Sequence, residues 1–314
     1  MMKPLLALAA VLLSGAAPAQ AFPSKTIRLV VPNPPGGTVD IVARTVALTM
    51  TSTFGQSVIV DTRPGGNTMI GTNIVARAPA DGHTVAMVGT SFVTNPFLRE
   101  VPYDALRDFA PLARLVTLPY LVAAHPSVPA KSVKDLVAIA RARPNDLNYA
   151  SFAFGELIGE SLKAAAGVQM NFVPYQGGVQ ATIAVAGGHA GVLVGPLSDA
   201  TPYIASGRLR PLAVTTLARA EAFKTVPTVA ESGYPGFDWA SWIGAAAPGG
   251  TPQPVIAKLS AEMLRALDNR EAVSNLARLS VAPAPLAAEA FAGFLRSEMQ
   301  RMEKVIRQAN IKPD

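Results

Sequence analysis

The sequence carries four short turns whose residue types suit the binding of an anion. Those at 35–38, 65–68 and 177–178 lie between an apolar run and a helical pattern, and the one at 90–91 follows an apolar run. A helix N-terminus offers free backbone N–H groups and the positive end of a dipole, and glycine lacks the Cβ that would hold a ligand away. The residues that could contact an anion in these turns are Pro35, Gly36, Gly37, Thr38, Asn67, Thr68, Thr90, Ser91, Gly177 and Gly178.

These turns also have a purely structural interpretation. A Pro-Pro-Gly-Gly run is by itself more often a turn than an anion site. Thr38 is equally suited to be a helix cap, and Asp40 in the first turn would complement the helix dipole. Both interpretations stay open for any single motif.

The sequence lacks the residues that catalysis, metal binding or cofactor binding would need. The 314 residues include no Cys and only three His, which do not have the spacing of a metal site. A G-x-S-x-G nucleophile motif, a phosphate-binding loop and a dinucleotide fingerprint are all missing from the sequence. Glu156 and Glu160 lie four residues apart, but such acids are common near the start of a helix. We therefore expect no enzyme, no metal and no cofactor.

The charge pattern argues against a nucleic-acid partner. The net charge is +6, from 27 Lys and Arg against 21 Asp and Glu, and no run of five or six basic residues occurs. Nucleic-acid binding usually requires a clustered basic stripe. Charged residues make up only 15% of the chain and hydrophobic residues 50%, which is typical of a globular protein with a large core.

Short β-rich runs alternate with helical patterns along the whole chain. This alternation predicts an α/β protein with a mostly parallel sheet covered by helices on both faces. Strands are expected at 27–31, 58–60, 83–88, 120–124, 148–151, 172–174, 192–194, 212–215 and 241–247. Helices are expected at 38–54, up to 77, at 133–142, 156–166 and 179–186, and over apolar faces near 256–267 and 291–306.

The length and the order of these elements predict two doubly wound α/β lobes after an export signal. Residues 1–21 have a Lys near the start, an apolar segment and an A-x-A cleavage site, as in a secretory signal peptide. We place lobe 1 at 22–115 plus 230–314 and lobe 2 at 116–229, whereas a simple tandem of two domains is the alternative. No Cys follows the apolar segment, so we expect a soluble, exported, periplasmic chain without a lipid anchor.

Five motifs in order along the chain resemble one known family. They are Val-Pro-Asn-Pro-Pro-Gly-Gly-Thr-Val-Asp at 31–40, Arg-Pro-Gly at 63–65, Pro-Ala-Asp-Gly-His-Thr at 79–84, Val-Pro-Tyr-Gln-Gly at 173–177 and Val-Pro-Thr-Val-Ala-Glu-Ser-Gly at 226–233. Together they are similar to the Bug family, the extracytoplasmic solute receptors of tripartite tricarboxylate transporters. The resemblance implies a type II periplasmic-binding-protein fold whose two lobes close around a small organic carboxylate. It also implies membrane transporter subunits as partners, and we expect a monomer.

The sequence departs from the family in two loops that should face the cleft. The loop after the strand ending at Ser151 is shorter and carries Phe152 and Phe154, and the loop at 90–96 is also shortened. Tyr175 could add a hydroxyl and a ring to the site. We expect phenylalanines at the cleft mouth and a ligand less anionic than citrate, such as a monocarboxylate or an aromatic acid. The alternative is that these rings merely fill space.

Two other functions remain possible at this level. The same fold could report the presence of a ligand to a membrane sensor instead of delivering it to a permease. An exported α/β enzyme is the third class, which the missing catalytic motifs disfavour. Sequence alone does not separate transport from sensing.

Overall fold

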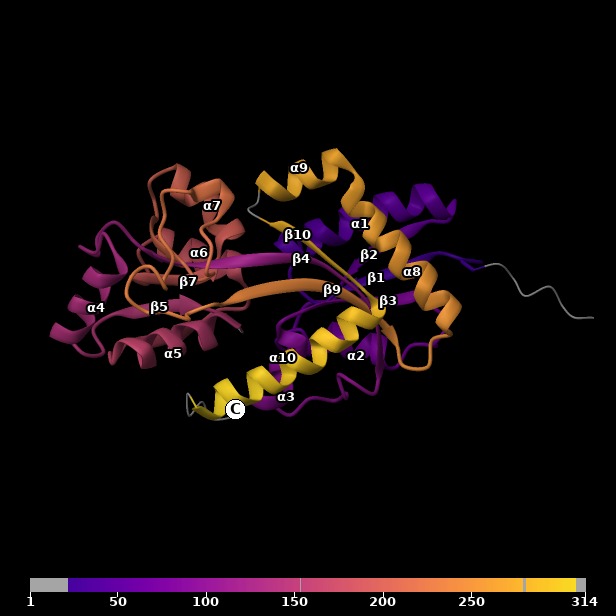
Figure 1. The fold of residues 1–314 in the computed structure, drawn as a ribbon, viewed down its shortest axis with the longest axis horizontal. Coiled ribbons are helices and arrows are strands. Elements are labelled where there is room, and N and C mark those ends of the chain that lie inside the picture. The colour runs from indigo at the N-terminus through magenta and orange to yellow at the C-terminus, as the bar shows by residue number, and fades with distance from the viewer. Residues whose placement is uncertain (1–21, 153, 279–280, 309–314) are drawn as a thin grey trace, which may run out of the picture.

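Two α/β lobes joined by long strands make up the protein (Figure 1). The computed structural model describes residues 22–152, 154–278 and 281–308. The expected signal peptide at 1–21 lies outside the described residues. The predicted two-lobe α/β architecture is confirmed, and what matters for function is how the two sheets place their helix starts.

The first lobe has a mixed sheet in the order β2-β1-β3-β9-β4, with β10 also paired to β4. Strands β1, β2 and β3 are parallel, whereas β9 runs antiparallel to both of its neighbours. The strands are β1 (Ile27–Val31), β2 (Val58–Thr62), β3 (Thr84–Gly89), β4 (Phe109–Ala124), β9 (Ala240–Pro248) and β10 (Ala282–Ala287). The helices of this lobe are α1 (Thr38–Phe54), α2 (Met69–Ala76), α3 (Ser91–Leu98), α8 (Gln253–Arg265), α9 (Arg270–Arg278) and α10 (Ala288–Gln308).

The second lobe is built on the other half of β4. Its sheet runs β4-β7-β5-β6, and β8 pairs with the opposite side of β4. The strands are β5 (Asn148–Ser151), β6 (Asn171–Pro174), β7 (Val192–Pro196) and β8 (Arg210–Val214). The helices are α4 (Val133–Ala142), α5 (Phe154–Ala166), α6 (Gly178–Ala186) and α7 (Leu197–Ala205).

Hydrophobic periodicity explains why the helices lie where they do. In α1 the residues Val42, Val46 and Met50 are at most 1% exposed and recur at helical spacing, so one face packs on the sheet. In α4 the Ser132 side chain caps the helix by accepting a hydrogen bond from the Asp135 N–H at 3.1 Å. Both helices have the bounds predicted from the sequence.

Strand β4 carries the chain from one lobe into the other. Its residues up to Pro119 pair with β9, and from Tyr120 onward they pair with β7. The strand paired with β4 therefore changes from one in the first sheet to one in the second between Pro119 and Tyr120. This change lies four positions beyond the expected boundary at 115. The proposed lobe bounds stay a prediction.

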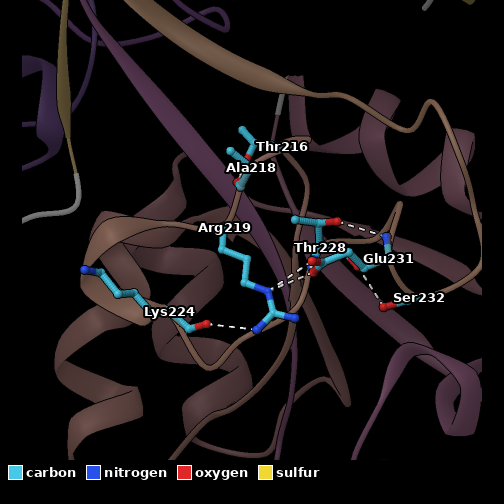
Figure 2. Close-up of polar contacts among 7 residues, drawn as sticks. All are labelled: Thr216, Ala218, Arg219, Lys224, Thr228, Glu231 and Ser232. Atoms are coloured by element: carbon cyan, nitrogen blue, oxygen red, sulfur yellow. Dashed lines mark hydrogen bonds and ion pairs between the residues drawn. The ribbon is translucent and has the colours of Figure 1, made fainter.

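The chain returns to the first lobe through a loop held by polar contacts, in the motif at 226–233 (Figure 2). The Thr228 N–H donates to Glu231 Oε2 at 2.7 Å, and the Glu231 N–H donates to Thr228 Oγ1 at 2.9 Å. This reciprocal pair has the pattern of a capping box. Arg219 Nε donates to Glu231 Oε2 at 2.9 Å and Arg219 Nη1 to the Lys224 carbonyl at 3.0 Å. The motif thus fixes the shape of the return loop.

The structure corrects three parts of the sequence prediction. The sheets are not mostly parallel, because β4, β8, β9 and β10 all form antiparallel pairs. The segment at 90–96, expected as a shortened loop, lies almost entirely in α3, and a further helix, α7, follows β7. Phe92 is 1% exposed and packs on Tyr103 and Phe109 in the core, so it does not line the cleft mouth.

Candidate functional site

A cleft between the two lobes brings together most of the residues expected to bind an anion. It encloses about 830 Å³, including the space at its opening to solvent. Its walls come from the starts of α1, α3, α5, α6 and α7 and from the stretch of β4 where the chain changes sheets. The lining residues that the sequence predicted are Pro35, Gly37, Thr38, Thr90, Ser91, Phe152, Phe154, Gly177 and Gly178.

A second hollow of about 750 Å³ adjoins the first on the side of α2. Asn67 and Thr68 line it, and Ser91 and Phe152 line both hollows, so the two hollows share part of their walls. Asn67 and Thr68 have left-handed backbone with φ of 50° and 77°, a conformation that is costly for a β-branched residue. The Asn95 amide holds this turn by donating to the Asn67 carbonyl at 2.7 Å.

The start of α1 is shaped by its glycine turn. Gly36 adopts φ of +78°, which favours glycine, and its N–H donates to Asp40 Oδ2 at 3.0 Å. Asp40 therefore holds the turn, as its structural interpretation predicted. Gly37 caps the helix without a side chain and lines the cleft, so its backbone lies open to a ligand.

Thr38 joins the two lobes across the cleft. Its Oγ1 lies 2.8 Å from Ser198 Oγ and donates to Asp199 Oδ1 at 3.1 Å. Thr38 begins α1 of the first lobe, whereas Ser198 and Asp199 lie in the first turn of α7 of the second. These contacts exist only while the lobes are close together.

Asp199 is the one formally charged residue among the described residues that line the two hollows. Burial raises the pKa of its carboxyl to about 6, although hydrogen bonds from Thr38 and Ser198 act in the opposite direction. Sequence reasoning missed this residue. The signal was present, since a β-rich run at 192–194 precedes it, just as a strand precedes the turn at 35–38.

Aromatic rings form the inner wall beside Asp199. The Tyr120 and Phe154 rings meet edge to face with centroids 5.6 Å apart, and Trp242 also lines the cleft. Burial, and then the neighbouring Asp199, raise the pKa of the Tyr120 hydroxyl, which is therefore neutral at ordinary pH. Tyr120 and Trp242 were not expected at the site, because only the crossing of β4 and its pairing with β9 bring them there.

Hydroxyl groups at the start of α3 already have partners within the protein. Thr90 Oγ1 lies 2.8 Å from Ser241 Oγ, and Ser91 Oγ lies 3.1 Å from Thr68 Oγ1. Ser241 was also missed by sequence reasoning. A ligand at this end of the cleft would meet hydroxyls that neighbouring side chains hold in position.

Three predicted site residues lie elsewhere. Gly36 is in the α1 turn but does not line either hollow. Ser151 is fully buried behind the wall, where its hydroxyl donates to the Val194 carbonyl at 2.5 Å. Tyr175 packs against the core of the second lobe next to α6. The Glu156–Glu160 pair is not a site either, because Glu160 accepts a hydrogen bond from Tyr149 at 2.6 Å and pairs with Lys163.

The described part of the chain offers neither a metal-ligand cluster nor a candidate membrane span. No three His, Asp or Glu side chains gather there in a way that could hold an ion. Within the same residues, no helix is both long and apolar enough to cross a bilayer. The described cleft walls contain no Lys, Arg or His, so attraction for an anion there would come from helix starts and polar groups.

Comparison with known proteins agrees with this geometry. Residues 42–311 match the tripartite tricarboxylate transporter family receptor. The chain is 31% identical to Protein BugT of Bordetella pertussis, over 94% of this chain and 92% of that protein.

Two solved structures are similar to the whole fold. One is an R. palustris protein with adipate, at TM-score 0.89 and 32% identity, covering 93% of this chain and 100% of the other. The other is MatC from Rhodopseudomonas palustris with bound malate, at TM-score 0.83 and 29% identity, covering 91% of this chain and 100% of the other. The resemblance noted in the sequence is thereby confirmed: the chain belongs to the receptor family of the tripartite tricarboxylate transporters.

Proposed function

We propose that this chain is a periplasmic receptor that captures a small organic carboxylate by lobe closure and delivers it to the membrane subunits of a tripartite tricarboxylate-type transporter. The observation that carries the proposal is the interlobe cleft, whose described walls are made of helix starts and contain no cation. Adipate and malate are bound in related structures, which supports a carboxylate as the ligand class. The expected signal sequence supports a periplasmic location.

Lobe closure would form the hydrogen bonds of Thr38, and lobe opening would break them. When the lobes separate, Thr38 loses its hydrogen bonds to Ser198 and Asp199, and the helix starts become hydrated. When they meet around a ligand, the same helix starts are desolvated and bind an anion more strongly. The connections that cross between the lobes, β4 and the segment before β9, would act as the hinge.

The binding half of the proposal is tested on the purified mature chain beginning at Phe22. Calorimetry and thermal shift would screen monocarboxylates, dicarboxylates, tricarboxylates and aromatic acids. A ligand at a hundred times its Kd should stabilise the folded protein by about 2.7 kcal/mol. For a chain of this size that corresponds to a rise in Tm of roughly 4 °C. If no carboxylate of any class raised the Tm, the proposed function would be wrong.

The delivery half needs a cellular test. Deleting this gene should abolish uptake of the identified carboxylate, and the mature chain added back in the periplasm should restore it. Uptake that is unchanged by deletion, together with tight binding in vitro, would favour a receptor that signals to a membrane sensor. Sedimentation of the mature chain would test the expected monomer in the same preparation.

A further inference from the structure

Asp199 places one of the protein's own carboxylates inside the cleft proposed to bind a carboxylate. Its Oδ1 accepts hydrogen bonds from Thr38 at 3.1 Å and from Ser198 at 3.2 Å. Both donors lie at helix starts, on α1 and α7. The carboxylate thus occupies one of the anion-favouring positions that the fold creates.

The other oxygen of Asp199 is open to a ligand. No described residue donates a hydrogen bond to Oδ2, although Asp199 lines the cleft. Oδ2 also lies against Gly178 at the start of α6, so closely that a Cβ on that residue would overlap it. Asp199 therefore stands between the starts of α1 and α6, and Oδ2 is an acceptor without a donor.

This position changes what the inner end of the cleft can accept. A ligand carboxylate placed there would meet a like charge in a partly desolvated site where no described lining residue is a cation. An N–H or O–H group would instead complete the hydrogen bonding of Oδ2, and a cationic donor would also offset the cost of burying the charge.

The hollow on the side of α2 differs from the surroundings of Asp199. The starts of α3 and α2 contribute Ser91, Asn67 and Thr68, and the hollow around them has no acidic residue among its described lining. The rings of Phe154, Tyr120 and Trp242 line the same cleft as Asp199 and Ser91. The two adjoining hollows therefore combine hydroxyl and amide groups at the starts of α2 and α3, an apolar wall of rings, and an acceptor at Asp199, which lines only the first hollow.

Resting on the proposed function, we infer that Asp199 selects a monocarboxylate whose far end carries a hydrogen-bond donor, an ammonium group by preference, over the dicarboxylate of the same length. The carboxylate of this ligand lies toward the starts of α2 and α3, and its donor meets Asp199 Oδ2. The ligand is then less anionic than citrate, as the sequence led us to expect.

The test is calorimetry at pH 7.5 with matched compounds of four, five and six carbons. At each length, three compounds share one carboxylate and differ at the other end, which is an ammonium, a methyl or a second carboxylate. Aminobutanoate, butanoate and succinate form the shortest set, and aminohexanoate, hexanoate and adipate the longest. An aromatic set of aminobenzoate, benzoate and terephthalate extends the comparison to rings.

We expect the amino acid of the best-fitting set to bind at least about tenfold more tightly than its dicarboxylate. In the Asp199→Asn variant this preference should fall below about threefold, because the amide can donate to a second carboxylate and no longer attracts a cation. Asp199→Ser provides a smaller neutral substitute if the asparagine variant folds poorly. Asp146→Asn, which alters an exposed carboxylate 61% accessible to solvent, should leave the preference unchanged.

Two outcomes would overturn the inference in distinguishable ways. Tightest binding of a dicarboxylate by the wild type, with no change in Asp199→Asn, would remove the role of Asp199 but leave the carboxylate receptor intact. Failure of every compound to bind either protein would overturn the proposed function as well.

Discussion

Replacing Asp199 with asparagine should stabilise the ligand-free protein at neutral pH by an amount that depends on pH. Burial raises the pKa of this carboxyl from the ordinary value of 3.8 to about 6. Each unit of pKa corresponds to 1.36 kcal/mol, so the ionised carboxyl destabilises the folded state by about 3 kcal/mol above pH 6. Asparagine has a similar shape and never carries this charge.

The sign of the effect follows from proton binding. Between about pH 4 and pH 6 the folded state holds the proton on Asp199, whereas the unfolded state has released it. The stabilising contribution of the protonated Asp199 carboxyl to the free energy of unfolding is therefore fully present below the pKa of this group in the unfolded state. It is lost as the pH rises through the pKa of the group in the folded state. Asp199→Asn has no carboxyl to ionise and suffers no such loss, so the unfolding free energy of the variant minus that of the wild type grows with pH.

Urea titrations of both proteins, followed by circular dichroism between about pH 4 and pH 8, measure this difference directly. We expect it to increase by about 2.4 kcal/mol across the range, with most of the change between pH 4 and pH 6. Asp146→Asn is the control, because its exposed carboxylate should change the free energy by less than about 0.5 kcal/mol at any pH. A difference that stayed constant with pH would show that Asp199 is not desolvated in the folded protein.

Three substitutions test other parts of the structure. Gly37→Leu should weaken carboxylate binding at least about tenfold in calorimetry with little change in Tm. The reason is that a Cβ there contacts only the Pro34 carbonyl oxygen at 3.5 Å and the side chain enters the cleft. Gly293→Leu on α10 is the control, and retained affinity in Gly37→Leu would mean that the α1 start does not meet the ligand. Phe154→Ala should lower the unfolding free energy by about 3–5 kcal/mol, since this ring is 2% exposed in the hydrophobic core; a loss below 1 kcal/mol would contradict that packing. Thr228→Ala should cost about 1 kcal/mol in urea unfolding through the lost cap of the return loop, and an unchanged midpoint would contradict it.

Local features of the chain were readable from the sequence because they depend on neighbouring residues. The alternation of apolar runs and helical spacing located α1, α4 and β5 with their observed bounds. Glycines and hydroxyl residues marked the turns where those helices begin, and nine of the predicted residues line the cleft that holds Asp199. The motifs in order along the chain also identified the family.

Features that depend on distant pairing were not readable in this way. An apolar run looks the same whether its partner strand is parallel or antiparallel, so the mixed sheets were missed. Phe92 and Phe152 follow strands in similar contexts, but α3 turns the first ring into the core, whereas the second faces the cleft. Ser151 ends a strand as expected, yet its hydroxyl turns inward to the Val194 carbonyl.

The sequence alone therefore predicted a two-lobe α/β receptor whose helix starts could bind an anion without cationic side chains. Only the tertiary structure decided which helix starts share one cleft, because that depends on β4 changing sheets between Pro119 and Tyr120. It also decided the charge of the site. Asp199 is an ordinary first-turn acid in the sequence, and it acquires its role because the fold buries it against Thr38, 161 residues away along the chain.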